Sequence, residues 1–267
     1  MNVWICTDME GLAGVDSWEQ CYAEDDNDPG YRYACEQLTL EVNAAVAGCF
    51  DGGATRVFVL DGHGRNRNNG FVTELLDPRV EKVWIDSLSP IRLEGLNESI
   101  DAVAIIGQHS MAGTINGFLD HTQSPKNLCR FLINGEEHGE MSQFAFYAGH
   151  YDIPLVYASG DEALCDEAER LFPGVVTTAT KRGTGWATCE LYPAGEVREN
   201  IRRDIAAAVS APQLPAPAKI ELPATLLTEW AYSAFADGRE DKPHVTRVNA
   251  RTLQWTIDDA RDVYSWQ

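Results

Sequence analysis

The stretch VWICTDMEG, from Val3 to Gly11, decides the fold of this chain. Its apolar first half predicts a buried strand, and its second half predicts a loop that carries two carboxylates. In open α/β sheets, ligands bind beyond the carboxyl ends of the strands. Asp8 and Glu10 are two positions apart, so an extended backbone would direct both to one side. The pair therefore either holds a cation or marks a solvated strand end at which Asp8 caps a helix.

Length and composition predict a globular protein of one large domain, or of one domain with a smaller companion. The chain has 267 residues, of which 44% are apolar and 23% charged. No apolar stretch reaches the ~18 residues of a membrane span, and no basic region precedes the first strand. The seven cysteines are scattered and form no CxxC pair. We therefore expect no disulfide framework, no cysteine-ligated zinc, no membrane segment and a cytoplasmic location.

The formal charge of -20 excludes some partners. Such a surface repels phosphate backbones, and no cluster of Lys and Arg interrupts it, so we expect no binding to nucleic acid. A field of this sign favours cationic small molecules and metal ions. The densest acidic patch, residues 24–28, is interpreted as a solvated loop, with a guide for substrate ammonium groups as the alternative.

Strands and helices alternate along the first 210 residues, which predicts an α/β fold. We expect a three-layer α/β/α sandwich with a mixed sheet. The predicted helices cover residues 31–50, 140–148, 161–171 and 194–209. The predicted strands cover residues 56–60, 80–85, 102–106 and 155–158, together with a hairpin arm at 129–133 that turns at Asn134-Gly135.

A proline-rich segment, residues 210–217, is the clearest linker in the sequence. It predicts a metal-binding catalytic α/β domain over residues 1–210 and a small C-terminal α+β subdomain over 211–267. In the subdomain we expect a short strand at Ile220, a helix at 226–235, a strand with alternating apolar residues at 253–257 and a last amphipathic helix.

Histidines and carboxylates stand beside glycines at several expected strand or turn ends. His63 and His109 close the second and fourth strands, His121 lies in the loop that follows, and Glu140 follows the hairpin. Each alone has an ordinary explanation, such as a hydrogen-bonded polar residue or a favourable helix N-terminus. Their repetition together indicates a metal site. Imidazole and carboxylate without thiolate suit zinc or manganese, and a bridging carboxylate suits two metals ~3.5–4 Å apart.

Several motifs in one order resemble the zinc-dependent D-aminopeptidases of the DppA-like family. The similarity runs from residue 2 to about residue 210, and the segment 252–255 is also similar. The motifs are Asp8-Met9-Glu10-Gly11, Asp61-Gly62-His63-Gly64 with Asn68-Asn69, Gly107-Gln108-His109 with Ala112-Gly113-Thr114, His121-Thr122, and Ile133-Asn134-Gly135 leading to Gly139-Glu140.

The resemblance implies an aminopeptidase with two Zn²⁺ ions per subunit, Mn²⁺ being a possible substitute, assembled as a homo-oligomer. Its substrate would be a small peptide or amino-acid amide, with a D-amino acid expected. The implied metal ligands are Asp8, Glu10, His63, His109 and Glu140. The implied catalytic residue is His121. Many relatives have Ser where this chain has Gly62, and Ala-Arg where it has Ser110-Met111, which bears on how a substrate carboxylate is held.

This inventory suggests a chemistry. Asp8 could bridge the metals, one metal would polarise the scissile carbonyl, and the other would activate a water or anchor the α-amine. His121, outside the ligand set, could move a proton or stabilise the oxyanion, and we rank a covalent role lower. Asp61 either orients a histidine or forms a turn. Glu136 and Glu137 are expected in solvent, and the thiol of Cys6 in the core.

Two other classes remain open. One is a dinuclear metal hydrolase of another small amide, a cyclic imide or a phosphoester. The motif loops offer only Arg65, Arg67 and Lys126 for a phosphate, which counts against the phosphoester. The other class is a non-catalytic peptide-binding protein, against which the presence of every ligand type argues.

Overall fold

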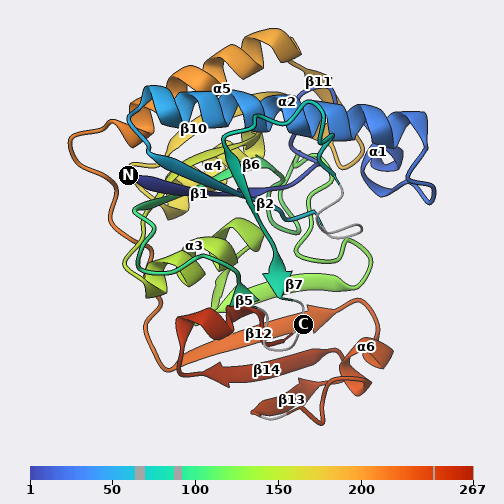
Figure 1. Cartoon of the computed structure of the whole chain (residues 1–267). Coiled ribbons are helices and arrows are strands. Elements are labelled where there is room, and N and C mark those ends of the chain that lie inside the picture. The colour runs from blue at the N-terminus through green and yellow to red at the C-terminus, as the bar shows by residue number, and fades with distance from the viewer. Residues whose placement is uncertain (64–69, 87–91, 243, 267) are drawn as a thin grey trace.

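A computed structural model describes residues 1–63, 70–86, 92–242 and 244–266 (Figure 1). Its main sheet has seven strands in the order β11-β10-β9-β6-β1-β2-β3. All neighbours in it are parallel except β10 and β11, so the sheet is mixed, as expected. The strands are β1 (Asn2–Thr7), β2 (Arg56–Asp61), β3 (Val80–Val83), β6 (Ala102–Gln108), β9 (Leu155–Asp161), β10 (Val176–Gly185) and β11 (Thr188–Leu191).

Helices cover both faces of this sheet, as Figure 1 shows. One face packs against α2 (Pro29–Asp51) and α5 (Ala194–Val209), and the other against α3 (Glu140–His150) and α4 (Glu162–Leu171). A hydrophobic core lies on each face of the sheet. Alternating residues of the buried strand β1 pack into the two cores, with Trp4 on the α3 side and Ile5 on the α2 side. The α/β class and the mixed sheet predicted from the sequence are therefore confirmed.

A second, antiparallel sheet lies beyond α3 (Figure 1). Its order is β13-β14-β12-β7-β8, with β13 (Val245–Asn249), β14 (Thr252–Ile257), β12 (Ala224–Trp230), β7 (Leu128–Ile133) and β8 (Glu136–Glu137). Helix α3 is buried from Met141 to Gly149 because it packs against both sheets. This double burial accounts for its apolar residues on every face.

Short elements complete the described chain. A two-stranded ribbon pairs β4 (Ile85–Asp86) with β5 (Arg92–Leu93). The remaining helices are α1 (Trp18–Tyr22), α6 (Ser233–Asp237) and a 3-10 helix at Ala260–Tyr264. None of the helices in the described ranges combines the length and apolar character that a membrane crossing needs. The cytoplasmic location stays a prediction.

Several expected elements differ from the structure. The expected helix at 226–235 is wrong, because residues 224–230 form the central strand β12, between β7 and β14. Ile220 belongs to no strand, and the third expected strand divides into β3 and β4. Strands β10 and β11 were not predicted from the sequence. The proposed division at residue 210 stays a prediction, and the strands after it share a sheet with β7.

Candidate metal centre

Three neighbouring strands deliver the first site residues to one edge of the main sheet. β1 lies between β2 and β6, and all three are parallel. Asp8 follows β1, His63 follows β2 and His109 follows β6. Because parallel strands end at the same edge, these three buried side chains converge where α/β sheets bind ligands.

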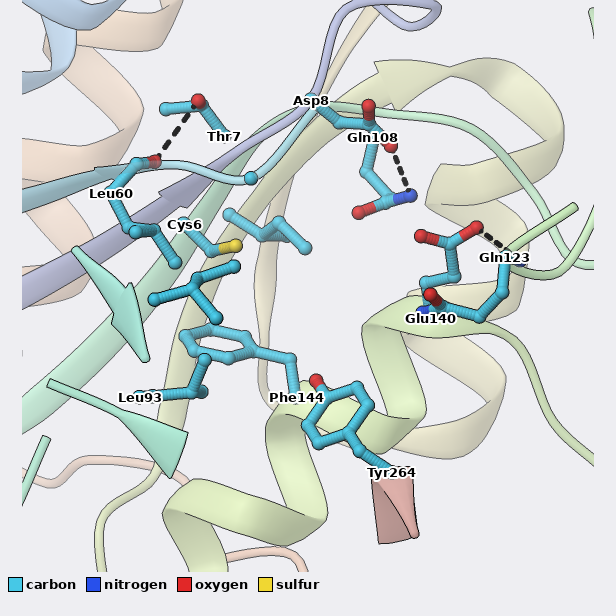
Figure 2. Close-up of a pocket in the computed structure, with 13 residues that line it drawn as sticks. Cys6, Thr7, Asp8, Leu60, Leu93, Gln108, Gln123, Glu140, Phe144 and Tyr264 are labelled. Carbon is cyan, nitrogen blue, oxygen red and sulfur yellow. Dashed lines mark hydrogen bonds between the residues drawn. The ribbon is translucent and has the colours of Figure 1, made fainter. Parts of the chain in front are cut away.

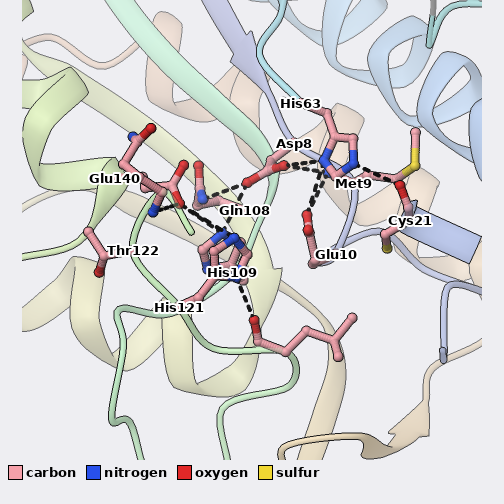
Figure 3. Close-up of polar contacts among 12 residues, drawn as sticks. Asp8, Met9, Glu10, Cys21, His63, Gln108, His109, His121, Thr122 and Glu140 are labelled. Carbon is pink, nitrogen blue, oxygen red and sulfur yellow. Dashed lines mark hydrogen bonds and ion pairs between the residues drawn. The ribbon is translucent and has the colours of Figure 1, made fainter. Parts of the chain in front are cut away.

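The six residues singled out from the sequence form two groups of three, shown in Figure 3. In each group, one possible ligand atom from every residue lies within 4.8 Å of the others. His121, which the sequence placed outside the ligand set, lies in the second group. The first group is Asp8, Glu10 and His63, and the second is His109, His121 and Glu140.

Asp8 joins the two groups through its two carboxylate oxygens. Its Oδ1 lies 2.9 Å from Nδ1 of His63, and its Oδ2 lies 3.3 Å from Nε2 of His109. Gln108 steadies the carboxylate by donating from Nε2 to Oδ2 over 2.7 Å. One oxygen therefore faces each group, which is the placement that a bridging ligand needs.

Backbone carbonyls fix the tautomer of each histidine. His63 donates from Nε2 to the carbonyl of Cys21, 2.9 Å away. His109 and His121 donate from Nδ1 to the carbonyls of Ser110 and Leu119, at 2.9 and 2.7 Å. Because a carbonyl can only accept, the neutral ring has its lone pair on the other nitrogen, which is the one directed toward the centre. Metal-ligating histidines are oriented in this way.

Buried charge at the centre fits a bound cation. Oε1 of Glu10 and Nε2 of His109 are buried without a hydrogen-bond partner. Burial, together with the charge of Glu10, raises the pKa of Asp8 to about 7. Two carboxylates held out of water at this spacing are costly unless a positive charge lies between them. A divalent ion would supply that charge and would take up the unused lone pairs.

Glu140 reaches the centre from the first turn of α3. Its Oε1 accepts a hydrogen bond from the backbone N–H of Gln123 over 2.6 Å and lies 3.3 Å from Nε2 of His109. Burial alone would raise the pKa of Glu140, but the nearby charge of His109 and the hydrogen bond from Gln123 outweigh it and lower the pKa. The N-terminus of α3 also favours the ionised carboxylate.

Two buried residues that the sequence analysis did not single out hydrogen-bond to the backbone of the loop that carries Glu10. Lys181 of β10 is fully buried and donates from Nζ to the carbonyls of Glu10 and Val15, at 2.6 and 2.5 Å. Glu41 of α2 accepts from the backbone N–H of Ala13 over 2.6 Å. No local motif marks Lys181, because its role depends on strand pairing far along the chain.

Gly62 explains one departure from the related motifs. A Cβ added there would meet the carbonyl oxygen of Thr7 at 2.5 Å and Sγ of Cys6 at 3.0 Å. The serine of many relatives would therefore require this backbone to move. Cys6 is half-buried and packs against the core that contains Trp4 and Phe144, in keeping with the core position expected from the sequence.

Other described residues considered in the sequence analysis lie in a turn or in solvent and not among the possible metal ligands. Asp61 shapes the turn, since its carboxylate accepts from the backbone N–H groups of His63 and Gly70 at 3.3 and 2.7 Å. Glu136 and Glu137 are exposed, as expected. Gly64, Arg65, Arg67, Asn68 and Asn69 lie outside the described residues.

An open groove of about 520 Å³ leads to the centre. His121 lines it and presents Nε2 3.4 Å from the hydroxyl of Tyr22, whereas His109 stacks behind His121 with ring centroids 3.8 Å apart. Trp18 and Lys126 also line the groove, and Nζ of Lys126 lies 5.9 Å from the centre of the Trp18 ring. His121 is thus the histidine of the second group that meets incoming molecules.

Fold and site together define an α/β protein with a largely buried cluster of carboxylates and imidazoles of the kind that can hold divalent cations. A family model described as D-aminopeptidase, peptidase family M55, matches residues 1–267. The chain belongs to this family. The family, and the class of enzyme that it represents, are the ones that the motifs indicated.

Two relatives agree with this assignment. A curated D-aminopeptidase of Bacillus subtilis (strain 168) is 30% identical over 182 residues, which are 68% of this chain and 64% of that relative. The match therefore spans less than two thirds of the relative's length. The solved structure of the zinc-dependent D-aminopeptidase DppA from Bacillus subtilis, described as a self-compartmentalizing protease, has a TM-score of 0.90 and 26% identity. That superposition covers 100% of this chain and 95% of the other.

Proposed function

We propose that this chain is a zinc-dependent aminopeptidase that removes the N-terminal residue of short peptides or amino-acid amides. D-amino acids are the proposed first residues, and the active form is a homo-oligomer. The observation that carries the proposal is the position of Asp8, with one oxygen toward His63 and the other toward His109. Two metal ions per chain fit this arrangement, with Mn²⁺ as a substitute for Zn²⁺.

The proposed ligands are Asp8, Glu10, His63, His109 and Glu140. Zinc, when bound, supplies Lewis-acid polarisation of the scissile carbonyl and activation of a water molecule. The chain's own contribution is to orient the histidines through backbone carbonyls and to hold the carboxylates beside them, largely out of water.

His121 is the proposed proton carrier. Its Nδ1 is committed to the carbonyl of Leu119, so Nε2 is the atom that can take a proton. That atom faces the open groove beside the hydroxyl of Tyr22. Nε2 accepts a proton from the attacking water and returns it to the leaving amine, as general acid-base catalysis requires.

The test combines a metal count with turnover. The protein, purified without chelator, should contain about two zinc ions per chain. It should cleave D-alanyl-D-alanine and D-alanine amide, lose this activity in EDTA and regain it with Zn²⁺ or Mn²⁺. L-alanine amide is the matched control for stereochemistry. Metal binding without cleavage of either substrate would favour another small amide or cyclic imide, or a peptide-binding role. Metal content far below one equivalent, with no activation by added ions, would contradict the proposal.

A further inference from the structure

A small cavity borders the candidate metal centre and adjoins the open groove. It measures about 70 Å³, and its polar end is formed by Asp8, Gln108, Gln123 and Glu140 (Figure 2). The cavity and the groove both reach Asp8, Gly62 and Glu140. The small cavity and the larger groove therefore meet at the metal centre.

The other end of the cavity is apolar. Among the described residues, most of its wall is core side chains with little or no exposure, such as Leu60, Ile105 and Phe144 at 1%, 1% and 2%. Figure 2 shows Phe144 and Tyr264 facing this space together with the thiol of Cys6. This end offers contact mainly to hydrocarbon. In the described part of the chain, its polar atoms are the hydroxyl of Tyr264 and the thiol of Cys6, and it has no charged side chain to balance a charged group.

We infer that this cavity receives the side chain of the substrate's first residue and restricts it to short aliphatic groups. The inference rests on the proposed aminopeptidase function and adds a substrate class to it. An aminopeptidase cuts behind one residue, so only one residue needs room on the amino side of the scissile bond. The leaving portion can continue for any length and occupies the open groove.

The volume sets the size limit. An engineered apolar cavity of about 150 Å³ holds one benzene molecule. The cavity here has about half that volume. It admits the methyl of alanine or the isopropyl of valine and excludes the ring of phenylalanine. Charged side chains are excluded because the apolar wall leaves them unsolvated.

The experiment compares kcat/KM for the amides of D-alanine, D-valine, D-leucine and D-phenylalanine in the zinc-loaded enzyme. D-valine amide should exceed D-phenylalanine amide by about 100-fold, since a pocket discriminates by roughly 10- to 200-fold for each methylene that it cannot hold. Equal rates for these two substrates would overturn the inference. So would rapid cleavage of D-lysine amide.

Enlarging the cavity should move the limit. Leu93→Ala should raise the rate for D-leucine amide relative to D-valine amide by about tenfold. Leu96→Ala is the matched control, because Leu96 is a comparably buried residue of the same core that does not line the cavity. If Leu93→Ala does not fold, Phe144→Leu is the second variant, with Phe146→Leu of the same helix as its control. Equal ratios in the folded variant and its control would overturn the inference.

Binding distinguishes this inference from the proposed function. Calorimetry with the free amino acids needs no turnover and reports the side-chain preference directly. Tighter binding of D-valine than of D-phenylalanine, lost in Leu93→Ala, would support the cavity even if no amide is cleaved. Cleavage without any side-chain preference would leave the aminopeptidase proposal intact and reject the cavity.

Discussion

Asp8 is the residue on which both halves of the site depend. It is the first residue after strand β1, and its backbone N–H donates to the carbonyl of Ile106 over 2.8 Å. This bond fixes the carboxylate between the ends of β2 and β6. A glutamate would place its carboxylate one carbon farther from the same backbone, so both the charge and the length of the side chain matter here.

Replacing Asp8 tests the bridge. Asp8→Asn should lower zinc content and turnover together, because an amide cannot supply the negative charge that a bridging ligand shares between two cations. Zinc per chain, measured by mass spectrometry, and cleavage of D-alanine amide are the two readouts. Asp152→Asn, at an exposed carboxylate that pairs with Lys219, is the control and should change neither. Full zinc content with a near-normal rate in Asp8→Asn would remove the bridging assignment.

His121 can act as a metal ligand or as a proton carrier, and one variant separates these roles. In the proposed mechanism, His121→Ala keeps both metals and the fold while kcat falls by ~10²–10⁴-fold. The loss should appear mainly in kcat because the group acts in the transition state. His150→Ala, at a histidine that pairs with Asp259, should leave rate and metal content unchanged. Loss of one zinc from His121→Ala would make His121 a ligand, and an unchanged kcat would exclude it from the mechanism.

At the scale of elements, the edge of the main sheet was predictable and the second sheet was not. The ends of β1, β2 and β6 could be expected from short apolar runs followed by Gly, His or Asp, because such strands are local patterns. Buried positions alternate along strand β12, but its apolar residues do not, because Leu227 points outward and Thr228 inward, so the sequence pattern predicts a helix there. The position of this strand is set by pairing with β7, which precedes it by a long stretch of chain. Pairing of this kind leaves no local signal.

Strand β10 was missed for a related reason. Its inward residues include Thr180 and Lys181, which bond backbone carbonyls of the metal-binding loop instead of packing in an apolar core. A strand with this composition shows no hydrophobic period. The six residues that the structure groups together could nevertheless be singled out from the sequence, because they lie in or near short glycine-containing motifs, whereas the residues that support them lie in elements that only the folded chain brings near.

Replacing Lys181 tests whether the loop between β1 and α1 needs its hydrogen bonds to keep the metal ligands in place. Lys181→Met leaves the carbonyls of Glu10 and Val15 buried without their donor, which costs about 1–3 kcal/mol for each unsatisfied group. The loop should loosen, and zinc affinity should fall by about 10- to 100-fold, as for other residues that orient ligands. Competition with a chromogenic chelator measures the affinity. Lys219→Met, at a half-exposed lysine, is the control. Unchanged zinc affinity in a folded Lys181→Met variant would limit the lysine to a role in stability.

At the scale of the whole molecule, the charge of -20 on each chain opposes the assembly of the homo-oligomer proposed above, because like-charged subunits repel. Self-repulsion of a chain with this charge opposes compaction, and it rises as further carboxyl groups ionise. Light scattering should give a mass that is a multiple of 29.5 kDa. Bound divalent ions reduce the net charge at the centre of each subunit, so the metal-loaded protein should also be the more stable form.

The response of stability to pH depends on a buried acid away from the ligands. Glu41 lies within α2, and burial raises its pKa from 4.5 to about 8. In the unfolded chain the group ionises near its ordinary value, so between these two pH values the folded state binds the extra proton. The contribution of Glu41 to the free energy of unfolding is therefore at its largest below about pH 4.5, and it is lost as the pH rises toward about 8.

Glu41→Gln tests this dependence, because glutamine keeps the acceptor for the N–H of Ala13 and cannot ionise. Near pH 5 the variant and the parent should have similar free energies of unfolding. At pH 9 the variant should be more stable by a few kcal/mol, since each pKa unit corresponds to about 1.4 kcal/mol. Urea unfolding at both pH values measures the difference. Glu36→Gln, at an exposed position of the same helix, should show no such change between the two pH values. An equal effect of Glu41→Gln at pH 5 and pH 9 would mean that Glu41 is already ionised in the folded protein and that its charge is balanced within the fold.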